Sequence, residues 1–204
     1  MQIGIVDYGA GNILSVYNSI YNLGYDPIVI KNSEQLNEVD KIIIPGVGSA
    51  FKTINTLKEK GFINGINKFY ESGKPILGIC LGFQIFASKL FENGTSKGVG
   101  LINGNVESIE IPQKFNIGWC EVEIDETLAS QIGINIKSDF YFCHSYYLNL
   151  KPNIGTARCL GTTFFKQKIP SIVVNNNFIG TQFHPEKSQG NGIKFLKYFL
   201  KSKD

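Results

Sequence analysis

One cysteine lies where its chemistry could be used. The stretch GICLG (78–82) follows an apolar run and places Cys80 between two glycines. This spacing is typical of a nucleophile elbow, a sharp turn from a strand into a helix, where a side chain at either glycine would collide with nearby backbone. The dipole of the helix that follows would favour a thiolate at Cys80. The short pattern is also found around buried structural cysteines, so it predicts a nucleophile only together with suitable partners.

Few residues can serve as a base for this thiol, because the chain contains two histidines. Pro185 follows His184 and disfavours helical geometry there, so we expect an extended segment. Residues two apart in an extended chain point to the same side, which places Glu186 beside His184 to orient and charge its ring. The predicted catalytic set is therefore Cys80, His184 and Glu186. Its chain order differs from the Ser–acid–His order of α/β-hydrolases.

A thiolate that attacks a carbonyl carbon also needs donors for the oxyanion that forms. The backbone N–H of Leu81, directly after the nucleophile, is one candidate. The second would come from IPGVGSAF (44–51), where Gly46 and Gly48 let the backbone approach a ligand. An ordinary glycine-rich turn between a strand and a helix is the alternative interpretation.

The remaining polar residues give weaker signals. His144 ends an apolar strand and has no acid nearby, so we interpret it as a structural histidine, with pocket lining as the alternative. Alternate carboxylates at 121–126 indicate the solvated face of a strand. Close groups of His, Cys, Asp and Glu with metal-ligand spacing are missing from the sequence, so it predicts no metal and no cofactor.

The elements that position these residues follow from the hydrophobic pattern. Uniformly apolar runs predict buried strands, and 3.6-residue periodicity predicts helices. The predicted strands are 3–6, 27–30, 41–44 and 75–79, and the predicted helices are about 12–23, 51–59, 62–72, 81–90 and 190–202. Short β-rich runs fill about 98–183, with a tight turn at the three asparagines 175–177. We predict one α/β domain over residues 1–204, with a mixed, mostly parallel central sheet flanked by helices and a β-rich second half.

Composition narrows the class of protein. The formal charge of +3 on 204 residues is too small and too dispersed for a nucleic-acid binder. Apolar runs stay well below the ~20 residues of a membrane helix, so we expect no membrane association. The four cysteines are widely separated. We expect reduced, mostly buried thiols and a cytoplasmic protein.

With IPGVG, GICLGFQ and FHPEKS present in this order, the whole chain resembles the class I glutamine amidotransferases. Within that family, four stretches resemble the glutaminase subunits of imidazole glycerol phosphate synthases, which belong to the histidine pathway. These stretches are DYGAGNILSV (7–16), PGVGSAF (45–51), FYFCHSYY (140–147) and GTQFHPEKSQ (180–189).

The resemblance implies a mechanism. Cys80 would attack the side-chain amide of L-glutamine and form a thioester, His184 would protonate the departing ammonia and then activate water, and Glu186 would hold His184. The backbones of Leu81 and Val47 would bind the oxyanion. The implied substrate-binding residues are Gly46, Gly48, Gln84, His144, Ser145 and Tyr146.

The resemblance also implies a partner, because ammonia released into water is protonated and ceases to be a nucleophile. In the family the partner is a (β/α)8-barrel cyclase, which forms a heterodimer with the glutaminase and receives ammonia through a sheltered passage. Asn12, Lys187 and the loops around Tyr8 and Tyr146 match family positions at or near that interface.

One segment departs from the family pattern. The family reads Pro-His-Met-Gly-Trp-Asn where this chain has FNIGWC (115–120). The missing Pro-His pair keeps a second interpretation open, a paralogous glutaminase subunit that feeds ammonia to a surface-sugar amidotransferase. A docking module without chemistry and a cysteine hydrolase that works alone are further alternatives.

Overall fold

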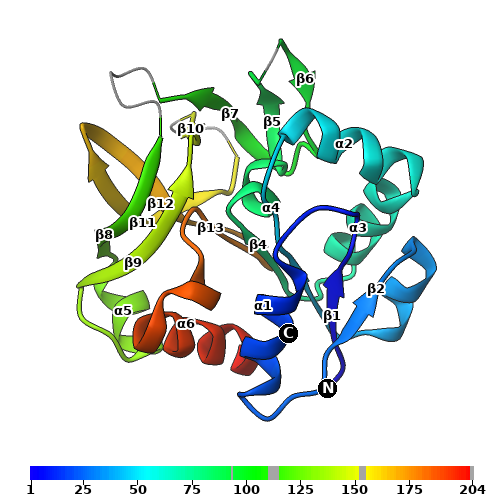
Figure 1. The fold of residues 1–204 in the computed structure, drawn as a ribbon, viewed down its shortest axis with the longest axis horizontal. Coiled ribbons are helices and arrows are strands. Elements are labelled where there is room, and N and C mark those ends of the chain that lie inside the picture. The colour runs from blue at the N-terminus through cyan, green and yellow to red at the C-terminus, as the bar shows by residue number, and fades with distance from the viewer. Residues whose placement is uncertain (93, 110–114, 152–154, 203–204) are drawn as a thin grey trace.

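The computed structural model describes residues 1–92, 94–109, 115–151 and 155–202. The β-rich region predicted for 98–183 is therefore described apart from residues 110–114 and 152–154. A nine-stranded sheet crosses the molecule in the order β2-β1-β3-β4-β13-β12-β11-β8-β9 (Figure 1). The mixed sheet is confirmed. The strands from β2 to β13 pair in parallel and those from β13 to β9 pair antiparallel, so the parallel share is smaller than predicted.

The parallel strands are β1 (Ile3–Val6), β2 (Ile28–Ile30), β3 (Lys41–Ile44), β4 (Ile76–Ile79) and β13 (Phe178–Thr181). The antiparallel strands are β8 (Asn116–Ile124), β9 (Lys137–His144), β11 (Arg158–Phe165) and β12 (Gln167–Asn175). The helices are α1 (Ile13–Tyr21), α2 (Ala50–Glu59), α3 (Phe62–Glu71), α4 (Leu81–Gln84), α5 (Glu126–Ile132) and α6 (Gln189–Lys201). Two 3-10 segments, η1 (Ser33–Glu38) and η2 (Pro185–Lys187), complete the main layer.

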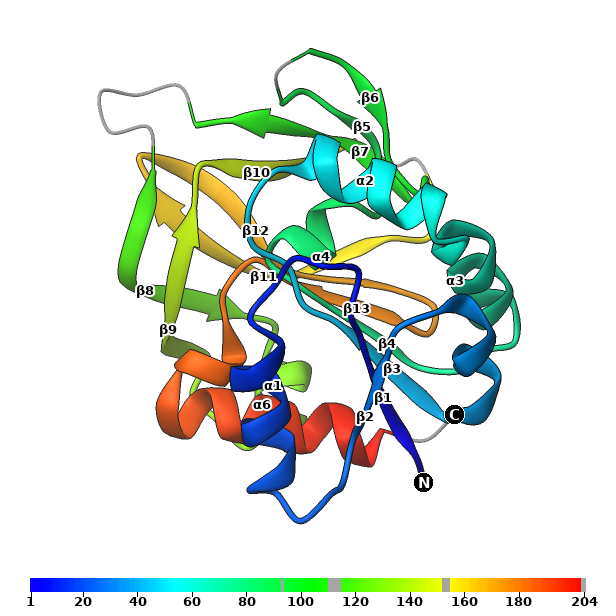
Figure 2. The ribbon, with the colours of Figure 1, turned by 45° about the vertical axis from the view of Figure 1, so that its right-hand side comes forward.

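Helices cover both faces of the parallel half. Helices α1 and α6 lie on one face, and α2 and α3 lie on the other (Figure 2). Helix α5 packs beside α6, near the antiparallel strands (Figure 1). Ile3 and Ile5 of β1 pack into the core under α1 and α6, whereas Val6 packs into the core under α2 and α3. A strand with a helix on each side must be apolar at every position, which is why these strands could be predicted from runs without alternation.

The helix predicted at 81–90 begins as predicted but is far shorter. Helix α4 ends at Gln84, and Ala87–Leu90 forms strand β5 of a second sheet, whose order is β10-β7-β5-β6. The other strands of this sheet are β6 (Ser96–Lys97), β7 (Ile102–Ser108) and β10 (Tyr146–Leu150). A short apolar run fits a buried strand as well as a helix, and the partner strands that decide the matter are distant in the sequence.

Two further expectations need correction. A helix, α5, lies within the region predicted as wholly β-rich. The Asp125 side chain caps its first turn by accepting from the Leu128 N–H, and Gly133 ends it in the left-handed conformation. The four cysteines are free, as expected, but Cys143 and Cys159 are exposed rather than buried. Among the described residues, each helix falls short of the length and apolarity needed to cross a membrane.

The parallel strands β3, β4 and β13 are neighbours, so their carboxyl ends lie at one edge of the sheet. Ile44 of β3 pairs with Gly78 of β4, and Thr181 of β13 pairs with Ile79. The segments that leave these strands carry the Gly46–Gly48 loop, Cys80 and His184. The topology thus brings together three stretches that are far apart in sequence, at the edge where open α/β sheets bind ligands.

The turn after β4 has no space for side chains at its glycines. A Cβ on Gly82 would lie 1.8 Å from the Ile44 carbonyl oxygen, and one on Gly78 would lie 2.6 Å from the Gly82 carbonyl oxygen. Both neighbours are backbone atoms, which cannot move aside as a flexible side chain can. The prediction that both glycines are needed at the turn is therefore confirmed.

We expect Gly82→Ala to lower the free energy of unfolding by about 3 kcal/mol or more, since overpacking against fixed backbone is at the costly end of its range. Urea denaturation followed by circular dichroism would measure the change. Gly190→Ala is the matched control, because Gly190 is exposed in α6 and a Cβ there would meet no atom within 4 Å. Equal stability of the two variants would contradict the prediction.

Candidate active site

Cys80 occupies a strained turn between β4 and α4. Its backbone has φ 53° and ψ −109°, in the region that favours glycine, and its N–H donates to the Thr181 carbonyl oxygen at 2.7 Å. Strain of this kind persists only where the surrounding structure enforces it, and it often marks a functional residue. Helix α4 is a single turn, so its dipole acts on Cys80 less strongly than the predicted ten-residue helix would.

His184 and Glu186 form a buried pair. The Nδ1 atom of His184 lies 2.8 Å from Oε1 of Glu186, and the side chains are 2% and 1% exposed. The contact was predicted, but the extended segment was not correct beyond His184. His184 itself is extended, and η2 then turns the chain so that Glu186 folds back onto the ring. The Nε2 atom of His184 has no hydrogen-bond partner among the described residues.

The electrostatics favour a charged imidazole. Burial lowers the pKa of His184, but the neighbouring Cys80 and Glu186 side chains outweigh it and raise the pKa to about 10. Because Nδ1 faces Glu186, Nε2 is the ring atom available to exchange a proton with the Cys80 sulfur or a bound molecule. The arrangement can support a thiolate, an imidazolium and an orienting carboxylate in one buried group.

A pocket of about 360 Å³ opens beside the Cys80 sulfur. Its size falls within the range of small-molecule sites. Most predicted site residues line it. Cys143, Glu92, Phe115 and Ile117 line it too, although none of these was predicted as a site residue. Its lining is Val47, Gly48, Cys80, Leu81, Gln84, Glu92, Phe115, Ile117, Cys143, His144, Ser145 and Tyr146. His184 and Glu186 are buried and are not part of this lining.

The glycine loop after β3 packs directly against the elbow. A Cβ on Gly46 would lie 2.4 Å from the Gly82 backbone nitrogen, so Gly46 shapes the contact rather than lining the pocket. Gly48 has φ 102°, and Val47 between them is 41% exposed. The structure therefore brings Val47 and Leu81, the two predicted oxyanion residues, to the same pocket wall.

Hydrogen bonds fix the opposite wall. Nδ1 of His144 lies 2.8 Å from the Tyr146 carbonyl oxygen, which can only accept, so this nitrogen carries the proton. Nε2 then accepts from Nδ2 of Asn116 at 3.3 Å. Burial is the main cause that lowers the pKa of His144 to about 4, so the ring is neutral. Both interpretations of His144 hold, since it is a partnered, buried histidine that also lines the pocket.

Among the residues matched to the family interface, Tyr146 lines the pocket, and the others follow the parallel strands β1 and β13. One of these is hidden. The Tyr8 side chain is buried, its hydroxyl donates to the Pro45 carbonyl oxygen at 2.6 Å, and burial is the main cause that raises its pKa. Lys187 is exposed, with its Nζ 5.8 Å from the centre of the Tyr141 ring. Asn12 precedes the first turn of α1.

Sequence reasoning missed Glu92 and Gln182. Glu92 accepts a hydrogen bond from the Ala50 N–H and lines the pocket, but it follows the segment wrongly predicted as helix, so no pattern pointed to it. Gln182 lies two residues before His184 and its Nε2 is 3.7 Å from the Cys80 sulfur. The alternation used to place Glu186 beside His184 would also have placed Gln182 there.

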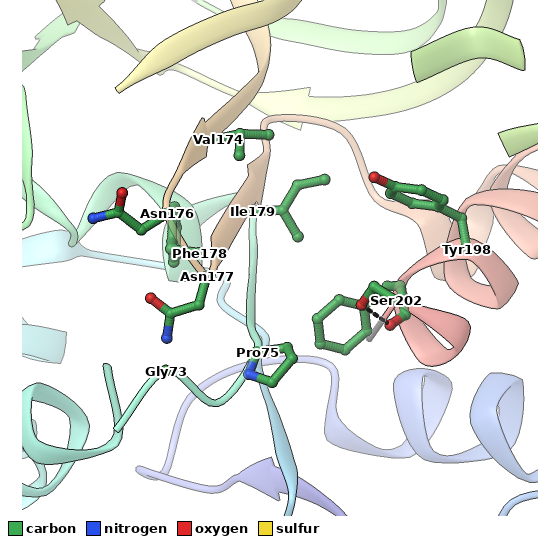
Figure 3. A pocket seen from close by; sticks show the side chains of 10 residues that line it. Gly73, Pro75, Val174, Asn176, Asn177, Phe178, Ile179, Tyr198 and Ser202 are labelled. Carbon is green, nitrogen blue, oxygen red and sulfur yellow. Dashed lines mark hydrogen bonds between the residues drawn. The ribbon is translucent and has the colours of Figure 1, made fainter. Parts of the chain in front are cut away.

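A second hollow, of about 320 Å³, lies at the opposite ends of the same strands, beside Pro75 and the turn before β13 (Figure 3). Its polar side chains are used inside the protein. The Asn177 amide donates to the Tyr70 and Lys74 carbonyl oxygens, and the Tyr198 hydroxyl donates to Gln131. The pocket beside Cys80 is therefore the better candidate for chemistry.

Comparisons with known proteins identify the family. The family described as "Glutamine amidotransferase class-I" matches residues 4–202. "Imidazole glycerol phosphate synthase subunit HisH 1" of Campylobacter jejuni strain RM1221 is 38% identical over 98% of this chain and 100% of its own length. The HisH subunit of Rhodopirellula baltica is 34% identical over 97% of this chain and 96% of its own length.

A solved structure described as PurLQS from Thermotoga maritima shares the fold, with a TM-score of 0.78, 20% identity and coverage of 98% of this chain and 97% of that one. The match over nearly the whole chain and the identities above 30% are decisive. The chain belongs to the class I glutamine amidotransferase family.

The raised pKa of His184 links the buried pair to stability. Protonation of His184 stabilises the folded state fully below its unfolded pKa of 6.5, and this contribution is lost as the pH rises through about 10. Glu186→Gln removes one cause of the raised pKa. We expect it to lower the free energy of unfolding more at about pH 6 than at about pH 10, by more than about 1 kcal/mol, since one pKa unit is about 1.4 kcal/mol.

Urea denaturation at the two pH values would measure this difference. Glu123→Gln is the control, because Glu123 is exposed on β8 and its loss should have nearly the same small effect at both. A loss for Glu186→Gln that does not change with pH would contradict the assignment of the ion pair.

Proposed function

We propose that this chain is the glutaminase subunit of an imidazole glycerol phosphate synthase. It hydrolyses L-glutamine to glutamate and ammonia and passes the ammonia to a cyclase. The observation that carries the proposal is the buried His184–Glu186 pair beside Cys80, at a pocket lined by the predicted substrate residues. Relatives that are 34% and 38% identical over 96% and 100% of their own length are named as subunits of that synthase.

In the proposed first step the Cys80 thiolate attacks the side-chain carboxamide carbon of glutamine, while the backbone N–H groups of Leu81 and Val47 bind the oxyanion. His184 gives its proton to the amide nitrogen, the carbon–nitrogen bond breaks, and ammonia leaves a glutamyl thioester. Water then adds to the thioester as His184 takes up a proton. The carbon–sulfur bond breaks, which releases glutamate and restores the thiolate.

The pocket suits the two ends of the substrate. Gly48 and the segment His144–Tyr146 lie in its walls beside Gln84. The Glu92 carboxylate offers a negative group for the α-ammonium of glutamine, and its bond from the Ala50 N–H fixes it against the oxyanion loop. Glu92 is the one carboxylate among the described residues that line the pocket, so it can orient a zwitterionic amino acid.

The proposal includes a partner, a (β/α)8-barrel cyclase in a heterodimer with a sheltered ammonia passage. Relatives are named as synthase subunits, and the exposed apolar residues Phe115 and Ile117 line the active-site pocket. Trp119, two residues further along β8, is exposed as well. An apolar rim around a site is typical of a surface that another protein covers. Asn12 and Lys187 would lie at this interface.

Residues 1–204 act as one glutamine amidotransferase domain in this proposal, and the family match covers almost all of them. The four cysteines are unpaired, which suits the reducing cytoplasm. The substrate and the implied partner reaction are those of a cytoplasmic biosynthetic enzyme.

The departure at 115–120 weighs less against the histidine pathway once its position is known. Asn116 is 1% exposed and bonds to His144 behind the pocket wall. The family's histidine is thus replaced at a buried position, which a partner does not contact. Phe115, which replaces the proline, is 56% exposed at the rim, so it is the part of the departure that could favour a sugar amidotransferase as partner.

A glutamine-analogue electrophile should label Cys80, because the analogue enters the glutamine pocket and meets the thiolate. We expect Cys80→Ala to abolish labelling and to lower glutaminase activity of the complex by at least about a thousandfold, as loss of a nucleophile does. Mass spectrometry of labelled peptides locates the adduct.

Cys143→Ala is the matched control, since this exposed thiol lines the same pocket and its loss should leave the Cys80 adduct unchanged. An adduct on Cys143 but not on Cys80, with the partner present, would favour a docking module without chemistry. Full glutaminase activity without any partner would favour a hydrolase that works alone.

Growth of a histidine auxotroph tests the pathway. Expressed in a strain that lacks its own glutaminase subunit but keeps the cyclase, this chain should restore growth without histidine, and Cys80→Ala should not. Co-purification with the cyclase should accompany rescue. Soluble protein that labels at Cys80 but neither rescues growth nor binds the cyclase would instead support the surface-sugar alternative.

A further inference from the structure

Gln182 lies with its side chain beside the sulfur of Cys80. It follows β13 directly, its residue is fully buried, and its Nε2 lies 3.7 Å from the Cys80 Sγ. Its backbone N–H is used in the sheet, where it donates to the Ser171 carbonyl oxygen at 3.0 Å. A buried amide that donates to a nucleophilic sulfur differs from a packing residue, because the bond gains strength when the sulfur becomes charged.

Neighbouring groups fix which end of the Gln182 amide faces the sulfur. Nε2 of Gln84 lies 2.6 Å from the Tyr146 carbonyl oxygen and 3.0 Å from Oε1 of Gln182. A carbonyl oxygen only accepts, so the NH2 group of Gln84 must point to it and its second hydrogen goes to Gln182. Oε1 of Gln182 is thereby the acceptor, and its NH2 group is left to face Cys80.

The same hydrogen bonds fix the orientation of the Gln84 side-chain amide. Both hydrogens of its amide are used inside the protein, so only its Oε1 can accept from a bound molecule. Gln84 therefore has two tasks, one toward the pocket it lines and one toward Gln182. The two glutamines are linked in one direction, from the Tyr146 carbonyl to the sulfur.

The sulfur has different partners in its two states. As a thiol, Cys80 donates to the Cys143 carbonyl oxygen at 3.7 Å. As a thiolate it is repelled by that oxygen and attracted by the Gln182 amide and the His184 ring. We propose that Gln182 is a further catalytic residue, a hydrogen-bond donor that stabilises the Cys80 thiolate, with Gln84 as the positioning residue that holds its amide. The role of Gln182 in turnover rests on the proposed glutaminase function. The hydrogen bond from Gln182 to the Cys80 sulfur does not.

Other groups near Cys80 also influence its charge, and the test must keep them constant. His184 faces the sulfur from the segment after β13, with Glu186 behind it. Tyr8, from the loop after β1, and the neutral His144, at the end of β9, also face this region. Glu92, Cys143 and Tyr146 are the further titratable residues in the pocket lining. None of them bonds to Gln182, so a substitution there leaves their contacts in place.

The test is alkylation of Cys80 by iodoacetamide as a function of pH, measured without glutamine on the full chain. Gln182→Met removes the donor and keeps the length of the side chain. We expect the midpoint of the rate profile to move up by about one pH unit, the size expected from loss of a bond to a charged group. With the partner bound, kcat for glutamine should fall about tenfold while KM changes less than about threefold.

Thr181→Val is the matched control. Thr181 precedes Gln182, is equally buried, and loses one hydrogen bond, from its hydroxyl to the Phe183 carbonyl oxygen. Its alkylation profile should match the parent protein. Gln84→Met should move the midpoint in the same direction by less than Gln182→Met, because it frees the Gln182 amide to rotate.

A Gln182→Met profile that coincides with the parent, in a protein that melts at a comparable temperature, overturns the proposal. If Gln182→Met does not fold, Gln182→Asn gives the same test, because its amide is too short to reach the sulfur. The alkylation readout needs no glutamine. A shifted profile without any glutaminase activity would therefore support the bond and count only against the proposed function.

Discussion

The site depends on one close contact, between the backbone that leaves β3 and the turn that follows β4. The Ile44 carbonyl lies where a Gly82 side chain would be, and Gly46 lies against the Gly82 nitrogen. This contact sets the distance between the Val47 loop and Cys80, and so the width of the pocket between them. The strain at Cys80, with φ 53°, persists because β13 on the other side holds its N–H through the Thr181 carbonyl. Three neighbouring parallel strands therefore fix the nucleophile from both sides.

The charges of His184 and Glu186 are stabilised by their contact with each other and not by solvent. His184 and Glu186 are both almost fully buried, and an isolated ion in such a place would be strongly destabilising. Their 2.8 Å contact and the nearby sulfur offset that cost, and the raised pKa of His184 follows from it. His144 is neutral, in contrast to His184. It lies only a few residues after Tyr141, whose carbonyl oxygen accepts from the His184 backbone N–H. Its ring bonds to neutral groups on both sides, so burial keeps it uncharged.

Much of the fold and of the site could be predicted from the sequence, wherever the local pattern and the tertiary structure agree. Strands β1 and β4, and β3 after its first residue Lys41, carry no polar side chain because helices cover both faces. The elbow glycines are dictated by backbone packing. Prediction failed for segments whose secondary structure depends on partner strands that are distant in the sequence. The segment 87–90 is a strand only because β7 and β6 pair with it, and Glu92 enters the site only because that strand carries it there. The turn of η2 was missed for a different reason. Pro185 makes only His184 extended, but the prediction assumed an extended chain through Glu186.

Asn116 is connected to the nucleophile through a series of hydrogen bonds. Asn116 donates to His144, His144 donates to the Tyr146 carbonyl, and that carbonyl also accepts from Gln84. Each amide and ring in this series has one orientation, because the Tyr146 oxygen cannot donate. A histidine at position 116 could take the same place only with its own proton directed at His144. Asparagine supplies that donor at any pH, and the Cys120 thiol, which donates to its Oδ1 at 3.3 Å, keeps the amide from flipping. Asn116 and Cys120 therefore form one unit, which holds the His144 ring in the wall of the pocket.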